Sequence, residues 1–183
     1  IGIAPANSTS VNDTIKNFNY TFENGKTYVV SVIGLTGSTA TPLALNINDL
    51  GREAAANPAQ VDVAVLHGSP DAPAVDVDAV YVANNLIPNL AYGTSTGYIG
   101  LTPDVYDLAV RPAGNPTVVV ATFRADLSGL AGGAAYVFAS GLLTGTPGFG
   151  LFAALANGTV IALPLAPAPA RVQIVHNAVA PTV

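Results

Sequence analysis

The fold is decided by the stretch Val63-Ala64-Val65-Leu66-His67-Gly68-Ser69-Pro70-Asp71-Ala72-Pro73-Ala74-Val75-Asp76-Val77. Its apolar opening continues the alternation that begins at Val61-Asp62-Val63, and alternation returns at Val75-Asp76-Val77. A period of two places one face of a β-strand on a core and the other face toward solvent. The Gly, Ser, Pro and Asp residues between the two segments are typical of a turn. The stretch therefore predicts two strands joined by a tight loop.

The same pattern continues along the rest of the chain. Asn157-Gly158 lies between two apolar runs and predicts a hairpin in which both turn residues take positive φ. Helix is expected only as one turn near residues 49–56. The expected strands cover residues 15–22, 27–33, 42–47, 61–65, 75–78, 106–110, 116–123, 135–141, 150–155, 159–163 and 171–175.

Motifs recur along the chain at a spacing of about 108 residues. Residues 22–29 resemble residues 130–137, and Leu35-Thr36-Gly37 resembles Leu143-Thr144-Gly145, each at an offset of 108. The pattern that ends at His67 returns at His176, with an offset of 109. About seven or eight strands in each repeat are typical of a sandwich. We therefore expect an all-β fold of tandem immunoglobulin-like β-sandwich modules with a repeat of about 108 residues.

With a repeat of about 108 residues, the chain contains one complete module and parts of two others. Residues 60–169 are expected to form one complete sandwich. Residues 1–59 match only the second half of a preceding module and need complementation, whereas residues 170–183 match only the first strand of a following module or a donor strand. The segment Leu165-Ala166-Pro167-Ala168-Pro169 is expected to be a stiff linker, because proline-rich chain stays extended.

The segment from Val63 to Val77 resembles the opening of DUF4397 domains, which have an apolar strand and then His-Ala-Ser-Pro-Asp-Ala-Pro-x-Val-Asp-Val. Residues 90–98 and 133–136 also fall where that family has similar residues, so the likeness covers residues 60–163 and, through the repeat, residues 1–59 and 170–183. The second copy, at residues 176–181, departs from the motif because it lacks Ser-Pro-Asp and is one residue shorter. The resemblance implies a secreted or surface-attached bacterial or archaeal β-sandwich, often in tandem, without an established enzymatic activity.

The composition excludes two classes of partner. Charged residues make up 9% of the chain and the net charge is −5, whereas ordinary soluble domains are roughly 25% charged. The six Lys and Arg are scattered singly, so there is no basic patch for nucleic acid, and no apolar run is long enough for membrane insertion. Cys, Met and Trp are absent, so no sulfur is exposed to oxidation. This composition favours an extracellular or cell-surface location.

No catalytic site is expected, and we interpret the chain as a non-enzyme. His67 and His176 hold the same position in two copies, but neither has a second His or a Cys to complete a zinc site. Ser69 lacks the Gly-x-Ser-x-Gly elbow, and the second copy has no Ser at its position. We expect each His to bond loop backbone and fix the turn that follows.

Asp71, Asp76 and Asp78 are the candidate ligands for a cation. Ca²⁺ takes about six to eight oxygen ligands, and Asp76 and Asp78 share one face of a strand. The spacing does not match an EF-hand loop, and Asp71 also suits an Asx cap on its own turn. No cofactor is expected, with calcium as the alternative.

Two further features concern the surface. Asn7, Asn12, Asn19 and Asn157 begin Asn-x-Ser/Thr triplets and are candidate glycosylation sites. The seven tyrosines suit either a sugar-stacking platform or, as strand tyrosines more often do, half-buried packing.

Residues 1–59 are too short to close a sandwich interior, so they should leave apolar surface and unpaired strand edges open. Two interpretations follow. The chain is either a window on a longer covalent repeat, or a protomer whose C-terminal strand completes the N-terminal half of the next copy. The second interpretation gives a head-to-tail homopolymer. Its polymer interface consists of Arg171, Val172, Gln173, Ile174, Val175 and His176.

The preferred function is therefore an extracellular structural protein, the subunit of a surface filament or array assembled by β-strand complementation. The alternative is a tandem adhesin module that binds a glycan or protein ligand at the cell surface, at the Ser69–Asp78 loop or at an exposed tyrosine face.

Overall fold

The structure is a computed structural model that describes residues 1–168 and 170. Apart from one 3-10 helix, its regular elements are β-strands. The elements are β1 (Gly2–Ile3), η1 (Val11–Asp13), β2 (Lys16–Asn17), β3 (Val29–Ile33), β4 (Ala44–Asn48), β5 (Val61–His67), β6 (Val75–Ala79), β7 (Ala83–Leu90), β8 (Ile99–Leu101), β9 (Val105–Pro112), β10 (Ala121–Asp126), β11 (Ala134–Ser140), β12 (Gly150–Leu155) and β13 (Val160–Ala162).

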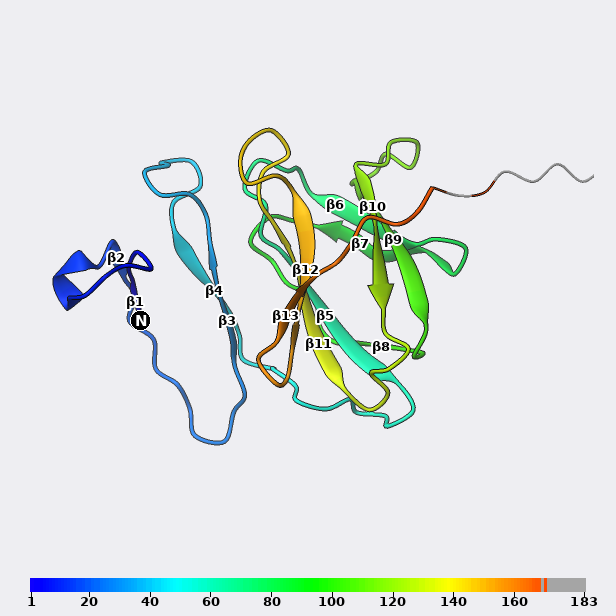
Figure 1. The fold of residues 1–183 in the computed structure, drawn as a ribbon, viewed down its shortest axis with the longest axis horizontal. Helices are drawn as coiled ribbons and strands as arrows, with labels where there is room; N and C mark the ends of the chain where they lie inside the picture. The colour runs from blue at the N-terminus through cyan, green and yellow to red at the C-terminus, as the bar shows by residue number, and fades with distance from the viewer. Residues whose placement is uncertain (169, 171–183) are drawn as a thin grey trace, which may run out of the picture.

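Strands β5 to β13 form a sandwich of two sheets, which confirms the predicted all-β sandwich fold (Figure 1). One sheet has the order β13-β12-β11-β5-β8 and the other β10-β9-β6-β7. β5 runs parallel to β11, and the other pairs in both sheets are antiparallel. Branched and aromatic side chains fill the space between the sheets, as expected for a pleated surface. They include Val61, Val63, Val75, Val77, Tyr106, Val110, Phe123, Val137 and Leu151.

β5 is buried on both faces, which corrects the expectation that its alternating pattern leaves one face in solvent. Val61 and Val63 face the space between the sheets, whereas Ala64 and Leu66 face outward. The outward side of the five-stranded sheet is covered by the hairpin of β3 and β4, which forms a third layer in Figure 1. A strand that is covered on both faces has apolar residues at odd and at even positions.

The N-terminal segment has less regular structure than its sequence predicts. The strand expected at residues 15–22 is reduced to β2, and residues 49–56 form no helical turn. Helix in the described part of the chain is limited to η1, where Ser10 accepts a hydrogen bond from the amide of Asn12 and Asp13 completes a capping box. The strand expected at residues 116–123 begins only at Ala121, because residues 116 and 117 form a turn and residue 120 a bend.

The hairpin predicted at Asn157-Gly158 is present between β12 and β13, but its turn differs. Only Gly158 takes positive φ, at 85°. The amide of Gly158 donates to Leu155 O, and the amide of Leu155 donates to Thr159 O, both at 2.9 Å. The connection is therefore a three-residue loop with one left-handed residue, the type in which Gly follows a type I turn.

The segment after β13 docks on the sandwich, so the beginning of the stiff linker expected at residues 165–169 lies against β10. The amide of Arg124 donates to Pro164 O and the amide of Ala166 donates to Thr122 O, each at 2.8 Å. Leu165 thereby forms a bridge with Phe123 at the outer edge of β10. The chain leaves the sandwich along the four-stranded sheet, whereas β3 and β4 lie against the five-stranded sheet (Figure 1).

A sharp turn at Gly141 connects β11 to the loop before β12. Gly141 has φ of 82°, and a Cβ at this position would collide with the carbonyl oxygen of Gly148. Across the turn, the amide of Leu142 donates to Pro147 O at 3.0 Å. Only glycine fits here, because the left-handed conformation and the close carbonyl both exclude a side chain.

We expect Gly141→Ala to lower the free energy of unfolding by about 2–4 kcal/mol, because left-handed strain adds to the collision with Gly148. Gly148→Ala is the matched control in the same loop, since nothing lies within 4 Å of its Cβ position and its φ is not positive. Urea unfolding measures the free energy of unfolding of both variants. Equal stability of the two variants would refute this account of the turn.

Candidate assembly surface

The hairpin of β3 and β4 covers the outer face of the five-stranded sheet. Val29 and Ile33 of β3 pack against a cluster formed by Ala64, Leu66 and Tyr136. The packing is incomplete, because a groove of about 310 Å³ remains between β3 and the sheet. The contact therefore buries one face of β3 partly and leaves room beside it.

Polar contacts fix the position of the hairpin on the sandwich. Asn46 of β4 donates to Gly93 O at 2.9 Å and accepts a hydrogen bond from the hydroxyl of Tyr136 at 3.3 Å. Arg52 forms an ion pair with Asp62 of β5, and its amide donates to the hydroxyl of Tyr98 at 3.1 Å. Asp62 is buried, at 3% exposure, so its charge requires a partner of this kind. No pattern in the sequence indicates the long-range contacts of Asn46.

The opposite face of the hairpin is open. Val30 and Val32 alternate with the docked residues of β3 and are 37% and 45% exposed. None of residues 1–59, all of which are described, reaches the burial of the sandwich core. Tyr20, Phe22 and Tyr28 cluster edge to face beside this side of the hairpin, with ring centroids 5.0–5.9 Å apart. The N-terminal segment thus has exposed apolar side chains and no fully buried residue.

One edge of β3 has no strand partner in the described part of the chain. The amide of Gly51 donates to Thr27 O, and the amide of Leu35 donates to Thr41 O, so odd-numbered residues of this strand bond toward β4. Bonding residues alternate in an antiparallel ladder. The amides and carbonyls of Tyr28, Val30 and Val32 therefore point to the free edge, where a further strand can pair.

The turn after β3 has the same geometry as the turn after β11. Gly34 has φ of 93°, and a Cβ there would collide with the carbonyl oxygen of Pro42, as a Cβ at Gly141 would with that of Gly148. Leu35 bonds across its turn as Leu142 does. The offset between these positions is 107, not the 108 that sequence similarity suggested, and a slip of one residue exchanges the two faces of a strand.

With this register, the open face of the hairpin corresponds to the inner face of the module. Val32 lies opposite Leu45 and Val30 opposite Ile47. In the module, Ala139 lies opposite Leu151 and Val137 opposite Ala153, and all four belong to the core between the sheets. The pairs that the module buries are therefore matched in the hairpin by pairs in which Val30 and Val32 are exposed and Leu45 and Ile47 are half-buried.

The loop between β5 and β6 is bonded to the loop between β11 and β12. His67 is 1% exposed, and its Nε2 lies 2.9 Å from Pro73 O, so this His fixes its turn as expected. Ser69 is fully buried and donates to Gly141 O at 2.8 Å. Asp71 accepts hydrogen bonds from the amides of Leu143 and Thr144 at 2.9 and 3.0 Å and so caps a distant loop, and within its own turn it accepts from Ser69 Oγ at 3.4 Å.

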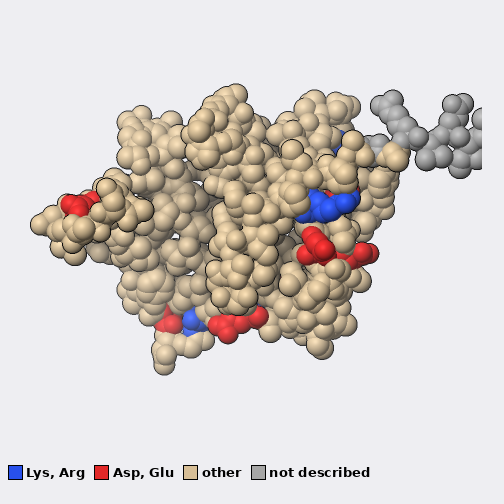
Figure 2. All heavy atoms as spheres, in the orientation of Figure 1, with Lys and Arg blue, Asp and Glu red and all other residues tan. Residues whose placement is uncertain are grey.

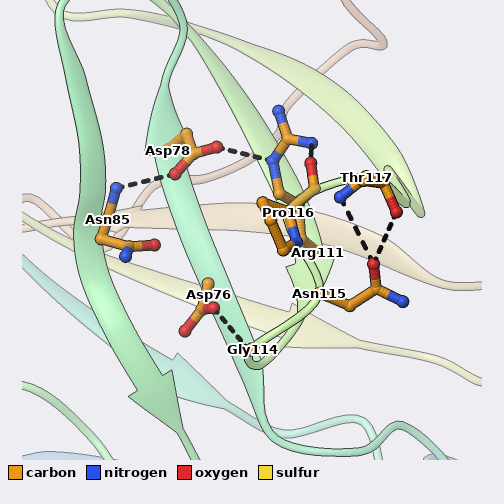
Figure 3. A network of polar contacts seen from close by, with 8 residues as sticks. All are labelled: Asp76, Asp78, Asn85, Arg111, Gly114, Asn115, Pro116 and Thr117. Atoms are coloured by element: carbon orange, nitrogen blue, oxygen red, sulfur yellow. Dashed lines mark hydrogen bonds and ion pairs between the residues drawn. The ribbon is translucent and has the colours of Figure 1, made fainter.

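Asp76 and Asp78 hold loop and bulge amides on the four-stranded sheet (Figure 3). Asp78 accepts from the amide of Asn85 at 2.7 Å and from Arg111 Nε at 2.6 Å. Asp76 accepts from the amides of Asn89 and Gly114 at 2.7 and 2.9 Å. Asn85 and Asn89 have positive φ, where the ladder between β6 and β7 shifts register. Asn tolerates this conformation better than most residues.

These contacts use the carboxylate oxygens that a cation would need. Burial opposes ionisation of Asp71, but the amides of Thr144 and Leu143 outweigh it and hold its pKa below the ordinary value. The amide of Asn85 and then the guanidinium of Arg111 lower the pKa of Asp78. Within residues 1–168 and 170, no three His, Cys, Asp or Glu side chains gather in a group that could hold a metal ion.

The remaining predicted sites lie apart from this surface or outside the described residues. Asn7, Asn12, Asn19 and Asn157 are all exposed, as glycan acceptors must be. Tyr106 and Tyr136 are buried in the module, whereas Tyr81 is 97% exposed. The predicted polymer strand, Arg171 to His176, falls outside the described residues. No helix among the described residues has the length and apolar character needed to cross a bilayer.

A family model described as "Domain of unknown function (DUF4397)" matches residues 61–183. The match begins at the first residue of β5 and includes the His67–Val77 loop that links β5 to β6. No curated protein and no solved structure matches the chain.

Burial lowers the pKa of His67, and the hydrogen bond to Pro73 opposes this only in part. The folded chain therefore keeps the imidazole neutral while the unfolded chain takes up a proton below about pH 6.5. We expect the free energy of unfolding to fall between about pH 7 and about pH 5, by up to about 1.4 kcal/mol per pH unit.

His67→Gln retains a donor for Pro73 but does not titrate, so its stability should depend less on pH in this range. His176→Gln is the control for the other His. Urea unfolding at a series of pH values gives the comparison. If His67→Gln and the natural chain show the same pH dependence, the neutral buried imidazole is ruled out.

Proposed function

The chain belongs to the DUF4397 family, and from this membership and its open N-terminal hairpin we propose that it is an extracellular structural protein. In this proposal it is the subunit of a surface filament or array, and copies join head to tail by β-strand complementation. The observation that carries the proposal is the hairpin of β3 and β4, which presents a free edge and a core-like apolar face.

The likeness between the two hairpins supports a tandem arrangement of modules. β3 and β4 match β11 and β12 in their turn and in their cross-strand pairs. The hairpin is then the second half of a sandwich whose first strands come from elsewhere. An exposed sheet edge of this kind is the usual receptor for an added strand.

The positions of the two ends of the described chain favour growth of a filament over closure of a ring. The N-terminal hairpin lies on the outer face of the five-stranded sheet, and the chain leaves along β10 of the other sheet (Figure 1). A contact between two different surfaces at opposite sides of a subunit is heterologous. Such a contact extends into a filament unless its rotation closes a ring.

The surface suits close packing of many copies. Charged side chains are sparse on the face shown in Figure 2, in keeping with a chain that is 9% charged. Like charges on neighbouring subunits would repel one another, and a weakly charged surface lowers this cost. The absence of Cys and Met also suits an oxidising extracellular location.

A second candidate function is adhesion, and Tyr81 is the observation that favours it. This residue is 97% exposed at the turn between β6 and β7, beside the exposed Val82. Its φ is 63°, a conformation that costs energy for an aromatic residue and is more frequent at functional sites. An exposed aromatic ring can stack on a sugar. The Ser69–Asp78 region is less suited, because Ser69 is buried and Asp71 is bonded to the Leu143–Thr144 loop.

We expect the 183-residue chain to form oligomers that grow with concentration, and a chain ending at residue 170 to remain monomeric, because it lacks the donor segment. Sedimentation velocity and negative-stain microscopy measure both. Urea unfolding of the shortened chain checks that its sandwich is intact.

A 183-residue chain that stays monomeric at every concentration would contradict the proposal and leave adhesion as the remaining candidate. Equal assembly of the 183-residue and shortened chains would also contradict it, since residues 171–183 would then have no part in the contact.

A further inference from the structure

The free edge of β3 has a counterpart inside the same molecule. The equivalent edge of β11 is occupied by β5, which runs parallel to it. In that ladder Val65 lies opposite Val137 and His67 lies opposite Ala139. The turn geometry equates Val137 with Val30 and Ala139 with Val32. The module therefore shows what kind of strand fits beside β3, in which direction and in which register.

The end of the chain has the sequence of such a strand. Val172, Ile174 and His176 repeat the spacing of Val63, Val65 and His67. In an extended strand, Val172 and Ile174 point to one face while Gln173 and Val175 point to the other. In β5 the face with Val63 and Val65 is the one directed between the sheets. The corresponding face of the C-terminal segment is thus apolar where the added strand needs it to be.

From these correspondences, and resting on the assembly proposed above, we propose that residues 171–176 of one copy pair in parallel with the free edge of β3 in a second copy. The register sets Ile174 opposite Val30 and His176 opposite Val32. The free amides and carbonyls of Tyr28, Val30 and Val32 then find partners. In this register Val172 and Ile174 extend the apolar face that is formed by the side chains of Tyr28, Val30 and Val32.

The charges at the start of β3 agree with this direction. The register sets Arg171 opposite Thr27, next to the ion pairs of Lys26 with Glu23 and Asp49. That cluster has two carboxylates and one ammonium group, so an added guanidinium balances its charge. The strands β3 and β4 contain no charged residue, and pairing along them buries no unpaired charge.

The donor belongs to another copy because of where the described chain ends. Leu165 sits on β10 of the four-stranded sheet, whereas β3 lies beyond the five-stranded sheet on the other side of the sandwich (Figure 1). The strand also has to run parallel to β3. A segment from a neighbouring copy meets both conditions without crossing the sandwich.

Cysteine crosslinking tests the register directly, because the chain has no Cys of its own. Val30→Cys is mixed with Ile174→Cys under mild oxidation, and nonreducing electrophoresis detects a covalent dimer of the two proteins. Residues opposite one another in adjacent strands are close enough for a disulfide. Val30→Cys mixed with Val175→Cys is the matched control, since Val175 points to the other face. Sedimentation of the natural chain in the same buffer reports assembly separately.

We expect the mixed dimer with Ile174→Cys and only background with Val175→Cys. The reverse result would overturn the register. Assembly without a crosslink in either mixture would overturn the docking of residues 171–176 on β3 while leaving the proposed function in place. Disulfide formation confined to single chains of a Val30→Cys/Ile174→Cys double variant would overturn the assignment to a second copy. Absence of assembly in the natural chain would overturn the proposed function together with this inference.

Discussion

The structure depends on the hairpin of β3 and β4. Only one face of this hairpin is covered, and within the described residues each of its strands is paired along one edge only. β3 and β4 pair with each other, and β3 packs its odd-numbered side chains against β5 and β11. The hairpin covers the outer face of the five-stranded sheet, and β5 is therefore buried on both faces. The other face of the hairpin, with Val30 and Val32, remains exposed. Exposed apolar strand edges are avoided in monomeric proteins, so this feature points to assembly more strongly than composition does.

The few charged residues of the sandwich mostly serve its architecture. Asp71 caps the Leu143–Thr144 loop, Asp76 and Asp78 hold amides at bulges of β7, and Asp62 pairs with Arg52 across the hairpin contact. Asp62 and Asp78 are buried and have protein donors, as polar groups in sheltered positions must. Ser69 and His67, which in other proteins could act as nucleophile and base, bond separate backbone carbonyls. The polar side chains of the motif at residues 67–78 form hydrogen bonds that hold neighbouring loops together.

Local features of the fold could be predicted from the sequence, because they depend on neighbouring residues. The presence of strands at β5 and β6 and the hairpin at Asn157-Gly158 follow from local sequence pattern. Contacts between distant residues could not be predicted. Nothing near Asp71 indicates that its partners are Leu143 and Thr144, 72 and 73 residues away. The repeat offset in β3 shows the same limit, since similar residues align at 108 but the glycine turns align at 107.

Hydrogen exchange of single amides in β3 tests the central claim most directly, because the two edges of this strand alternate along its sequence. In dilute monomeric chain, the amides of Val30 and Val32 should exchange quickly, while those of Ser31 and Ile33, which face β4, should be slower. On assembly the amides of Val30 and Val32 should become protected. Protection of these two amides in the monomer, unchanged on assembly, would mean that the edge of β3 is already paired and would contradict the account.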